Sequence, residues 1–477
     1  MTDEQAAATI PNLIGGAWRQ PARSVPVRDP YSGRVVAHAP DSTLEELDQA
    51  LDAAVAARAV MAALPGYQRA ALLRRVSALL AGRADAIAEV MTRETGKALK
   101  DARAEVVRSQ DTLGLAAEEA IRIEGEQVPL DGSAMGAGKL AFLLRFPVGV
   151  IGAITPFNAP FNLACHKIAP ALAAGNAIVL KAPPQSPGVV HRLVEMFVEA
   201  GAPPGAVNAL YGNEVGPALV RDRRVDFVTF TGSSRVGAEI RAASGLRRVA
   251  LELGGTGQTI VHADADIEAA APLCARNAMR LAGQSCISVQ TVYVHESLYD
   301  RFVERAVQEV KGMRLGDPMD PATDIGTLID EAAARRVEAW IAEAVAAGAT
   351  ALTGGRRHGA QVEPTVLVGV NPAMQVVCNE VFGPVVSILP YTDFDAVCRE
   401  VSDSRFGLQC GVFTRSMEIA MRAVRSIRTG GVILNGSSTW RTDQLAYGGV
   451  KDSGIGREGP RYAIRDMTEE RLVVFNM

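Results

Sequence analysis

Cysteine and histidine are scarce in this sequence: its 477 residues contain six of each, and both kinds are dispersed along the chain. No two cysteines have C-x-x-C spacing, and no H-E-x-x-H motif occurs. Metal sites and disulfide frameworks depend on such spacings. We therefore expect no metal ion and no disulfide scaffold.

The sequence also lacks long apolar runs and an excess of positive charge. No run of 18 apolar residues occurs, and the first residues, MTDEQAAATIPN, carry acids without the basic and apolar regions of an export signal. Lys and Arg number 49 against 53 Asp and Glu, which gives a net charge of -4. We predict a cytoplasmic protein that binds neither a membrane nor nucleic acid.

The pattern of apolar residues predicts an α/β protein with more than one domain, because 477 residues exceed one ordinary core. Residues 42–125 have helical periodicity, and Ser42-Thr43-Leu44-Glu45 has the form of a capping box. From Val148 onward, short apolar runs alternate with helical stretches such as residues 186–200. That alternation is typical of a parallel sheet with crossover helices.

A second alternation of strands and helices follows Gly255 and predicts a second α/β domain. We assign residues 1–125 and 148–253 to the first domain and residues 254–446 to the second. Residues 126–147 lack a helical period, and the chain ends in the apolar run RLVVF. We expect residues 126–147 and 457–477 to form a small strand module, completed by another subunit.

Cys286 and Glu252 form the candidate reactive pair. Cys286 lies in GQSCIS after a helical stretch that we expect to run from Ile267 to Leu281, and Glu252 lies in LELGG after an apolar run. Glycine-rich turns at such positions can direct a thiol and a carboxylate into a crevice at the carboxyl ends of strands. The residues alone also allow a buried structural cysteine and a solvated glutamate.

Asn158 is a third candidate, in ITPFNAPFN directly after the predicted strand VGVIGAIT. The N–H₂ group of its side chain can donate hydrogen bonds to a developing oxyanion. An asparagine that stabilises a turn is the alternative.

Eight motifs in fixed order carry a resemblance to a known family. They are IGGAW, ITPFN, KIAPALAAGNAIVLK, FTGSSRVG, LELGG, GQSCI, NEVFGPV and YGGVKDSGIGRE. In this ordered set, which spans nearly the whole chain, the sequence resembles the NAD(P)-dependent aldehyde dehydrogenase superfamily. The resemblance implies a Rossmann-type cofactor domain, a second α/β catalytic domain and a small β oligomerisation module.

The resemblance implies covalent catalysis that oxidises an aldehyde to a carboxylic acid. Cys286 would attack the aldehyde, Asn158 would hold the oxyanion, and Glu252 would activate the water that hydrolyses the thioester. Hydride would pass to NAD or NADP. A catalytically silent member that uses the fold for binding is the alternative from another class.

The cofactor residues also come from the resemblance. Lys181 would bind the adenosine ribose, and Ser233 the pyrophosphate at a helix N-terminus. Glu380 and Phe382 would position the nicotinamide ribose and ring. The full expected set is Thr155, Pro156, Phe157, Lys181, Gly232, Ser233, Val236, Glu252, Leu253, Gly254, Glu380 and Phe382.

Pro184 departs from many NAD-preferring relatives, which have a glutamate at this position. That glutamate grips the ribose hydroxyls and repels a 2′-phosphate, so its absence predicts that NADP is accepted. Thr256 replaces a common lysine, and nothing in the sequence explains this change.

Substrate residues are expected after the oxyanion asparagine, around the nucleophile and before YGG. They are Arg108, Ala159, His166, Ser285, Ile287, Arg441 and Tyr447. Ala159 and His166 replace aromatic residues common in enzymes for large apolar aldehydes, and either arginine could bind an anionic tail or form an internal ion pair.

The segments around Arg108 and GLQCGVFTRS resemble the branch of lactaldehyde, phosphonoacetaldehyde and semialdehyde dehydrogenases. We expect a small polar or acidic aldehyde as substrate, with a broad-specificity or aromatic aldehyde dehydrogenase as the alternative. Relatives of this kind form dimers or tetramers, so we expect a homodimer or a homotetramer.

Overall fold

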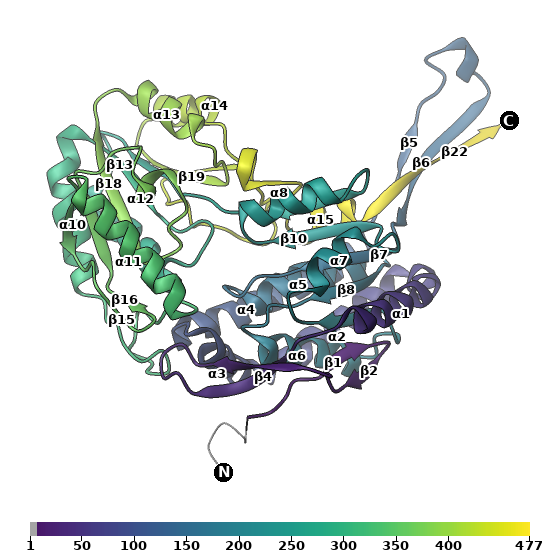
Figure 1. The fold of residues 1–477 in the computed structure, drawn as a ribbon. Helices are drawn as coiled ribbons and strands as arrows, with labels where there is room; N and C mark the ends of the chain where they lie inside the picture. The colour runs from purple at the N-terminus through teal and green to yellow at the C-terminus, as the bar shows by residue number, and fades with distance from the viewer. Residues whose placement is uncertain (1–6) are drawn as a thin grey trace.

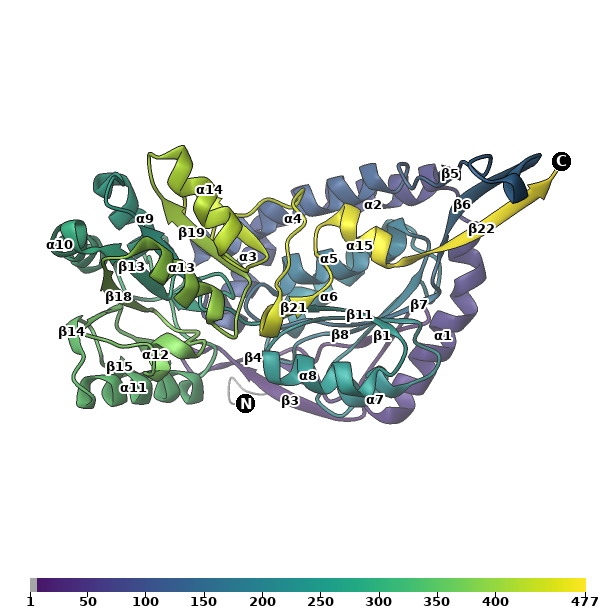
Figure 2. The ribbon, with the colours of Figure 1, turned by 90° about the horizontal axis from the view of Figure 1, so that it is seen from above.

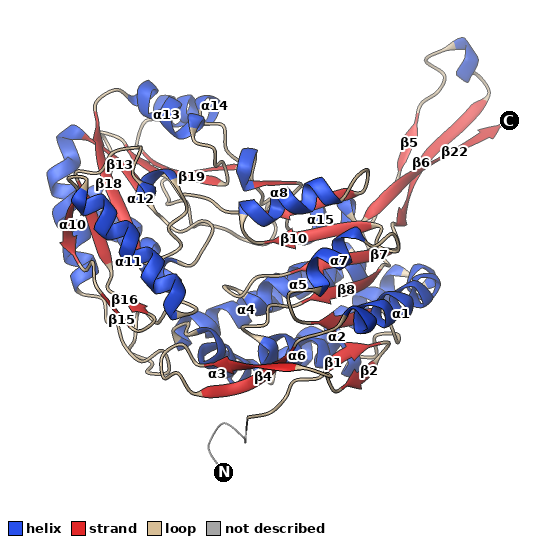
Figure 3. Cartoon of the chain, in the orientation of Figure 1, coloured by secondary structure: helices blue, strands red, loops and turns tan. Residues whose placement is uncertain are grey.

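The computed structural model describes residues 7–477 and arranges them as two lobes with a projecting arm (Figures 1 and 2). Each lobe contains its own sheet (Figure 3). The first lobe holds the N-terminal half of the chain, and the second holds most of the C-terminal half.

The first sheet has eight strands in the order β2-β1-β9-β8-β7-β10-β11-β21. Its five central strands are parallel, and the pairings at its edges, β2 with β1, β1 with β9 and β21 with β11, are antiparallel. The strands are β1 Asn12–Ile14, β2 Ala17–Arg19, β7 Val150–Ile154, β8 Ala177–Lys181, β9 Val207–Leu210, β10 Phe227–Thr231, β11 Arg248–Glu252 and β21 Gly454–Ile455.

Helices cover both faces of this sheet. Successive residues of a strand point to opposite faces, so Val150 packs with α1 and α7 while Ile151 packs with α4, α5 and α6. The two apolar cores explain why the strands read as continuous apolar runs. The helices are α1 Leu44–Ala63, α2 Gly66–Ala81, α3 Ala84–Thr95, α4 Leu99–Glu119, α5 Pro160–Ala173, α6 Pro187–Glu199, α7 Val215–Arg221 and α8 Ser234–Ala243.

The capping box of α1 lies one residue later than the sequence pattern predicts. Thr43 is the N-cap: its side chain accepts from the N–H of Glu46, and the Glu46 carboxylate accepts from the N–H of Thr43. The hydroxyl of Ser42 instead donates to Asn12 and accepts from the N–H of Tyr211. Ser42 is thus used to join α1 to the sheet, which no local pattern reveals.

The second sheet has seven strands in the order β14-β17-β18-β13-β12-β19-β20, all parallel except β14. Its strands are β12 Thr259–Val261, β13 Thr291–His295, β14 Thr350–Thr353, β17 Thr365–Val368, β18 Val385–Tyr391, β19 Gln409–Phe413 and β20 Gly431–Leu434. Its helices are α9 Ile267–Met279, α10 Tyr299–Lys311, α11 Glu331–Ala346, α12 Gln375–Cys378, α13 Phe394–Asp403 and α14 Met417–Ser426. Two strand pairs lie outside these sheets: β3 Ser24–Arg28 with β4 Val35–Pro40, and β15 Arg357–His358 with β16 Gln361–Val362.

The arm is an antiparallel sheet in the order β22-β6-β5 that projects from the first lobe (Figure 1). Its strands are β5 Glu126–Val128, β6 Lys139–Pro147 and β22 Thr468–Asn476, and β22 pairs along the full length of β6. The terminal strand therefore finds a partner within its own chain.

The C-terminal segment reaches the arm later than the expected boundary at residue 457. Helix α15, Pro460–Asp466, packs against α4 and α5 of the first lobe, and β21 just before it joins the first sheet. Only β22 enters the arm. The apolar residues Ala463 and Ile464 are buried on the first lobe, which holds the helix there.

Within residues 7–477, no helix combines the length and the apolar character that crossing a membrane requires.

Candidate active site

Four parallel strands of the first sheet deliver candidate residues to one edge. Asn158 follows β7, Lys181 ends β8, Ser233 follows β10, and Glu252 ends β11. The register aligns Ile154 with Lys181. It also aligns Thr231 with Glu252. Since the carboxyl ends of parallel strands meet at the same edge, residues almost 100 positions apart share one crevice.

Cys286 is brought to this crevice by a sharp turn in the second lobe. Helix α9 ends at Met279, not at Leu281 as its periodicity predicts, and the backbone of residues 281–283 is left-handed. Gly283, with φ +72°, lies so close to the carbonyl oxygen of Gly383 that a Cβ would overlap it. A glycine is therefore required where the chain turns toward Cys286.

Cys286, Glu252 and Asn158 line one cavity of about 410 Å³ between the lobes. Further residues expected to bind cofactor or substrate line it as well: Pro156, Phe157, Gly232, Ser233, Leu253, Gly254, Glu380, Phe382, Arg441 and Tyr447. The structure thus brings together most of the candidate residues from both halves of the chain.

The thiol of Cys286 lies in a largely apolar setting with one close polar partner. Its Sγ is 3.2 Å from the hydroxyl of Tyr447. Burial raises the pKa of the Cys286 thiol to about 12, the bond to Tyr447 lowers it, and the nearby carboxylate of Glu380 raises it. The thiol therefore needs further stabilisation of its anion to react near neutral pH.

Glu252 is a buried carboxyl group, 4% exposed, whose two oxygens have no hydrogen-bond partner among residues 7–477. Burial raises its pKa well above the usual range, and the charge of Glu458 raises it further. Burying a carboxyl group without a hydrogen-bond partner lowers the stability of the fold, so such a group in a cavity indicates a functional role. An elevated pKa makes the Glu252 carboxylate a stronger base than an exposed one.

Asn158 bridges the two lobes. Its Nδ2 donates to the carbonyl oxygen of Gln284 at 2.9 Å, two residues before Cys286. A side-chain amide carries two N–H donors, and this bond uses one. The contact holds the amide beside the turn that carries the thiol.

The crevice has the features of a dinucleotide site. Ser233 caps α8, and its hydroxyl accepts from the N–H of Val236. The N-terminus of this ten-residue helix favours negative charge such as a pyrophosphate. Burial lowers the pKa of Lys181 to about 8. Three of the expected cofactor residues, Thr155, Lys181 and Val236, do not line the cavity.

Two buried hydroxyl groups also fit a bound cofactor. Thr155 Oγ1 and Thr231 Oγ1 lack hydrogen-bond partners within the described chain, and both lie where β7 and β10 reach the crevice. Other buried hydroxyls of residues 7–477 also lack partners, but these two lie at the crevice, where the hydroxyls of a ligand could bond to them. We conclude that the residues present suit NAD(P).

Glu380 and Phe382 face this crevice from a loop of the second lobe. Glu380 accepts from the N–H of Gly255, and burial raises its pKa to about 7. Phe382 has φ +50°, a strained conformation for a residue with a side chain, and its ring meets Phe157 edge-to-face. Strain of this kind persists only where the surroundings impose it.

Gln290 imposes part of that geometry, although no sequence motif identified it. Its side chain donates to the carbonyl oxygens of Val376 and Asn379 and accepts from the N–H of Val381. These bonds span the loop that presents Glu380. The only sequence signal is a glutamine at the start of an apolar strand.

A cluster of charged side chains, most of them buried, lies beside the cavity and reaches its wall at Arg441 and Glu458. Glu458 accepts from Arg441 at 2.6 Å and from Lys167 at 2.9 Å. Asp443 accepts from Arg108 and contacts His166. Burial lowers the pKa of His166, so its imidazole is neutral near pH 7. The cluster then holds three cations against two carboxylates.

Most of the residues expected to bind substrate do not line the cavity. Arg108 and Arg441 both form internal ion pairs, the alternative that the sequence left open. Of the two, only Arg441 lines the cavity. Ala159, Ser285 and Ile287 also lie outside its lining, as does His166, which is 1% exposed. His166 points instead into the charged cluster, because α5 buries it completely.

Several residues that line the cavity were not predicted from the sequence. Gln284, Ile329, Ala333, Arg336 and Glu458 all line the cavity. Ile329, Ala333 and Arg336 come from α11 and the loop before it, which carry no recognisable motif. Glu458 ends the motif YGGVKDSGIGRE, so its position was a signal that could have identified it.

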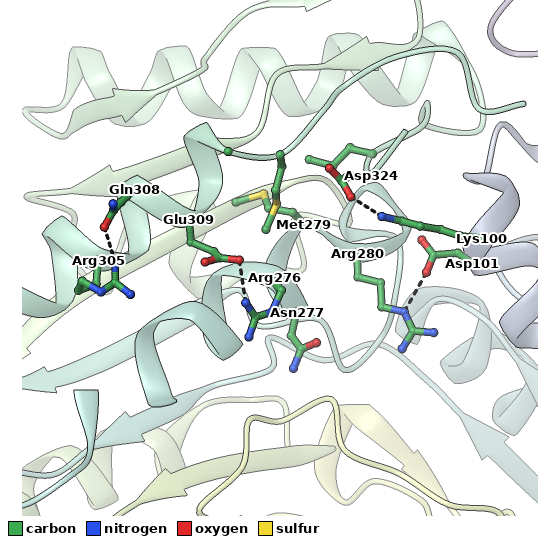
Figure 4. A pocket seen from close by; sticks show the side chains of 13 residues that line it. Lys100, Asp101, Arg276, Asn277, Met279, Arg280, Arg305, Gln308, Glu309 and Asp324 are labelled. Atoms are coloured by element: carbon green, nitrogen blue, oxygen red, sulfur yellow. Dashed lines mark hydrogen bonds and ion pairs between the residues drawn. The ribbon is translucent and has the colours of Figure 1, made fainter. Parts of the chain in front are cut away.

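A second, larger cavity of about 520 Å³ lies between α4, α9 and α10 (Figure 4). None of the three candidate catalytic residues lines it. Two ion pairs in its lining join α4 to the second lobe: Arg280 bonds to Asp101 at 3.1 Å, and Lys100 bonds to Asp324. Arg280 begins the turn toward Cys286, so its pair with Asp101 of α4 fastens that turn to the first lobe.

Comparison with known proteins gives consistent results. Residues 18–473 match the family model described as the aldehyde dehydrogenase family. A 3-sulfolactaldehyde dehydrogenase of Priestia megaterium is 44% identical over 466 residues, covering 97% of each chain. A lactaldehyde dehydrogenase of Methanococcus vannielii is 35% identical, covering 97% of this chain and 99% of that protein.

Solved structures agree with the sequence matches. Aldehyde dehydrogenase 21 from Physcomitrella patens, in complex with the reaction product succinate, superimposes with a TM-score of 0.96 at 39% identity. The match covers 98% of this chain and 99% of that one. These similarities confirm the fold class that the ordered motifs predicted.

Proposed function

The chain belongs to the aldehyde dehydrogenase family, and we propose that Cys286, Glu252 and Asn158 carry out the family's reaction in it. The protein is an NAD(P)-dependent oxidoreductase that converts an aldehyde to a carboxylic acid. One observation carries the residue assignment: a thiol, an unpaired carboxyl group and a side-chain amide line the same cavity.

Each of the three residues has a separate role. The sulfur of Cys286 bonds to the aldehyde carbon, while the side-chain amide of Asn158 and the backbone N–H of Cys286 stabilise the oxygen that becomes negative. Bound NAD(P)+ supplies the hydride acceptor. Glu252 takes a proton from the water that attacks the resulting thioester, the carboxylate product leaves, and the thiol is restored.

The cofactor is held by residues from both lobes. Ser233 and the N-terminus of α8 would hold the pyrophosphate, Lys181 the adenosine ribose, and Glu380 and Phe382 the nicotinamide end. Pro184, which is partly exposed three residues after Lys181, presents no carboxylate to a 2′-phosphate. We propose that NADP is accepted as well as NAD.

The substrate that fits best is a small aldehyde with an anionic tail. Two arginines, Arg336 and Arg441, line the cavity, and Arg441 is paired there with Glu458. The named relatives act on 3-sulfolactaldehyde and lactaldehyde, and a solved relative holds succinate. A sulfonate or a carboxylate is therefore the expected tail.

The arm supports a homo-oligomer. Strand β22 is an edge strand, and Leu472, Val474 and Phe475 on it are 59%, 43% and 52% exposed. Leu144 of β6 is 42% exposed. A long edge strand with exposed apolar side chains is normally covered in a native protein. We propose that a second copy covers it in a homodimer or a homotetramer.

Replacing Glu252 separates the two chemical steps. Glu252→Gln is expected to keep a first burst of reduced cofactor, since the thiol still attacks, while steady-state turnover falls about 100- to 10,000-fold. In the unaltered enzyme, turnover should rise with pH as Glu252 loses its proton, and this rise should disappear in Glu252→Gln. Stopped-flow absorbance measures both phases. Glu239→Gln, on exposed α8, is the control. Cys286→Ala should give no burst. Loss of the burst in Glu252→Gln would contradict this division of roles.

Cofactor preference is tested at position 184. We expect catalytic efficiency with NAD to exceed that with NADP by less than about 100-fold, or 2.7 kcal/mol. Pro184→Glu should lower efficiency with NADP about tenfold or more while leaving NAD in use, because the new carboxylate repels the 2′-phosphate. Gln185→Glu adds the same charge one residue further on and serves as the control. A larger preference for NAD in the unaltered enzyme would refute the proposal.

Substrate charge is tested with matched aldehydes. Catalytic efficiency with 3-sulfolactaldehyde should exceed that with lactaldehyde by about tenfold or more, and succinic semialdehyde should similarly exceed butanal. Arg441→Ala should reduce this preference most and Arg108→Ala less, with exposed Arg122→Ala as the control. Equal efficiency for charged and neutral aldehydes, or no effect of either arginine, would instead support broad specificity. Efficient oxidation of benzaldehyde would support the aromatic alternative.

Oligomer formation is tested on the arm. Light scattering is expected to give a molar mass two or four times the 50.4 kDa of one chain. Changing both Leu472 and Val474 to Lys should produce monomers, because charged side chains on an edge strand oppose pairing. Val345→Lys, an equally exposed site on α11, should leave the mass unchanged. A monomeric unaltered protein would rule out the proposed role of the arm.

A further inference from the structure

Tyr447 is the only hydroxyl-bearing residue of the described chain that bonds to the proposed nucleophile. Its hydroxyl lies 3.2 Å from Cys286 Sγ, and its residue is 5% exposed. The backbone of Tyr447 is held by two reciprocal hydrogen bonds with Glu458. The hydroxyl is therefore a fixed group at the sulfur and does not depend on a mobile loop.

Arg441 lies on the face of the Tyr447 ring. Its Cζ is 3.7 Å from the ring centroid, and its Nη2 donates to Glu458 at 2.6 Å. A guanidinium over an aromatic face interacts with the ring electrons, and arginine stays charged at every relevant pH. The positive charge behind the ring polarises the O–H bond toward the sulfur.

The groups that face Cys286 have opposing effects. Glu252 and Glu380 bring negative charge, while Arg441 and the Tyr447 hydroxyl favour the sulfur anion. Burial raises the pKa of Tyr447 well above its usual value. The tyrosine therefore keeps its proton when the thiol loses its own, and it can act as the donor to the thiolate.

We infer that Tyr447 is a catalytic residue: its O–H group donates a hydrogen bond to the thiolate of Cys286, with the Arg441 guanidinium supporting that charge through the ring. This inference rests on the proposed role of Cys286 as nucleophile. Tyr447 undergoes no proton transfer. The S–H proton leaves to water, and the freed sulfur electron pair forms the bond to the aldehyde carbon.

Tyr447→Phe tests the inference because it removes the hydroxyl and leaves the ring under Arg441. Iodoacetamide is applied to the full-length protein across a pH series, with and without NADP+, and modified Cys286 is measured by peptide mass spectrometry. We expect the pH of half-ionisation of Cys286 to rise by about 1, so that its alkylation near pH 7.5 slows about tenfold. The burst of reduced cofactor should slow by a similar factor.

Two controls belong to the same experiment. Exposed Cys378, in the same digest, should react equally in every variant. Tyr462→Phe makes the same change on α15, outside the cavity, and should leave the Cys286 profile unchanged. A further variant, Arg441→Lys, keeps the charge but not the planar group. It should raise the pH of half-ionisation of Cys286 by less than Tyr447→Phe does.

The outcomes distinguish this inference from the proposed function. An unmoved Cys286 profile in folded Tyr447→Phe overturns the inference, even where turnover falls, because the tyrosine then only shapes the substrate space. If Tyr447→Phe does not fold, an unmoved profile in Arg441→Lys overturns it. Undiminished turnover in Cys286→Ala instead refutes the proposed function.

Discussion

The parallel pairing of β7, β8, β10 and β11 is the constraint on which the site depends. Helices on both faces bury these strands, so their polar residues can emerge only at the ends. Parallel register then places those ends at one edge, where Asn158, Lys181, Ser233 and Glu252 gather. A change in register would move each of these groups away from the others.

The second lobe supplies the remaining residues of the site. Cys286 and Glu380 come from its loops, and Tyr447 comes from the segment that links β20 to β21, while Asn158 and Glu252 come from the first sheet. The cavity therefore exists only because the lobes pack together. Direct contacts between lobes maintain that packing beside the thiol, namely the bond from Asn158 to Gln284 and the pair of Arg280 with Asp101. The left-handed turn at residues 281–283 is the local strain that accompanies this arrangement.

Local patterns predicted the alternation of strands and helices in both lobes, and the strand expected at VGVIGAIT is β7. They failed where a distant contact decided the outcome. Ser42 has the right spacing to cap α1, yet it bonds to Asn12 and Tyr211 from other elements. The apolar pattern continues to Leu281, but α9 ends at Met279, and the backbone of Leu281 and Ala282 is left-handed where the chain turns toward Cys286. Residues 460–466 join the first lobe because its helices offer an apolar surface.

The sequence by itself determined the chemistry that the protein can perform, because the thiol, the carboxyl group, the amide and the glycine turns are present as residue types in a recognisable order. Only the tertiary structure decided which groups meet. Tyr447 and Cys286 are 161 positions apart, yet their side chains touch. Arg441 and Arg108 each pair with a buried carboxylate of the charged cluster, and only Arg441 also lines the cavity. Such pairings depend on distances in space, which spacing along a chain does not contain.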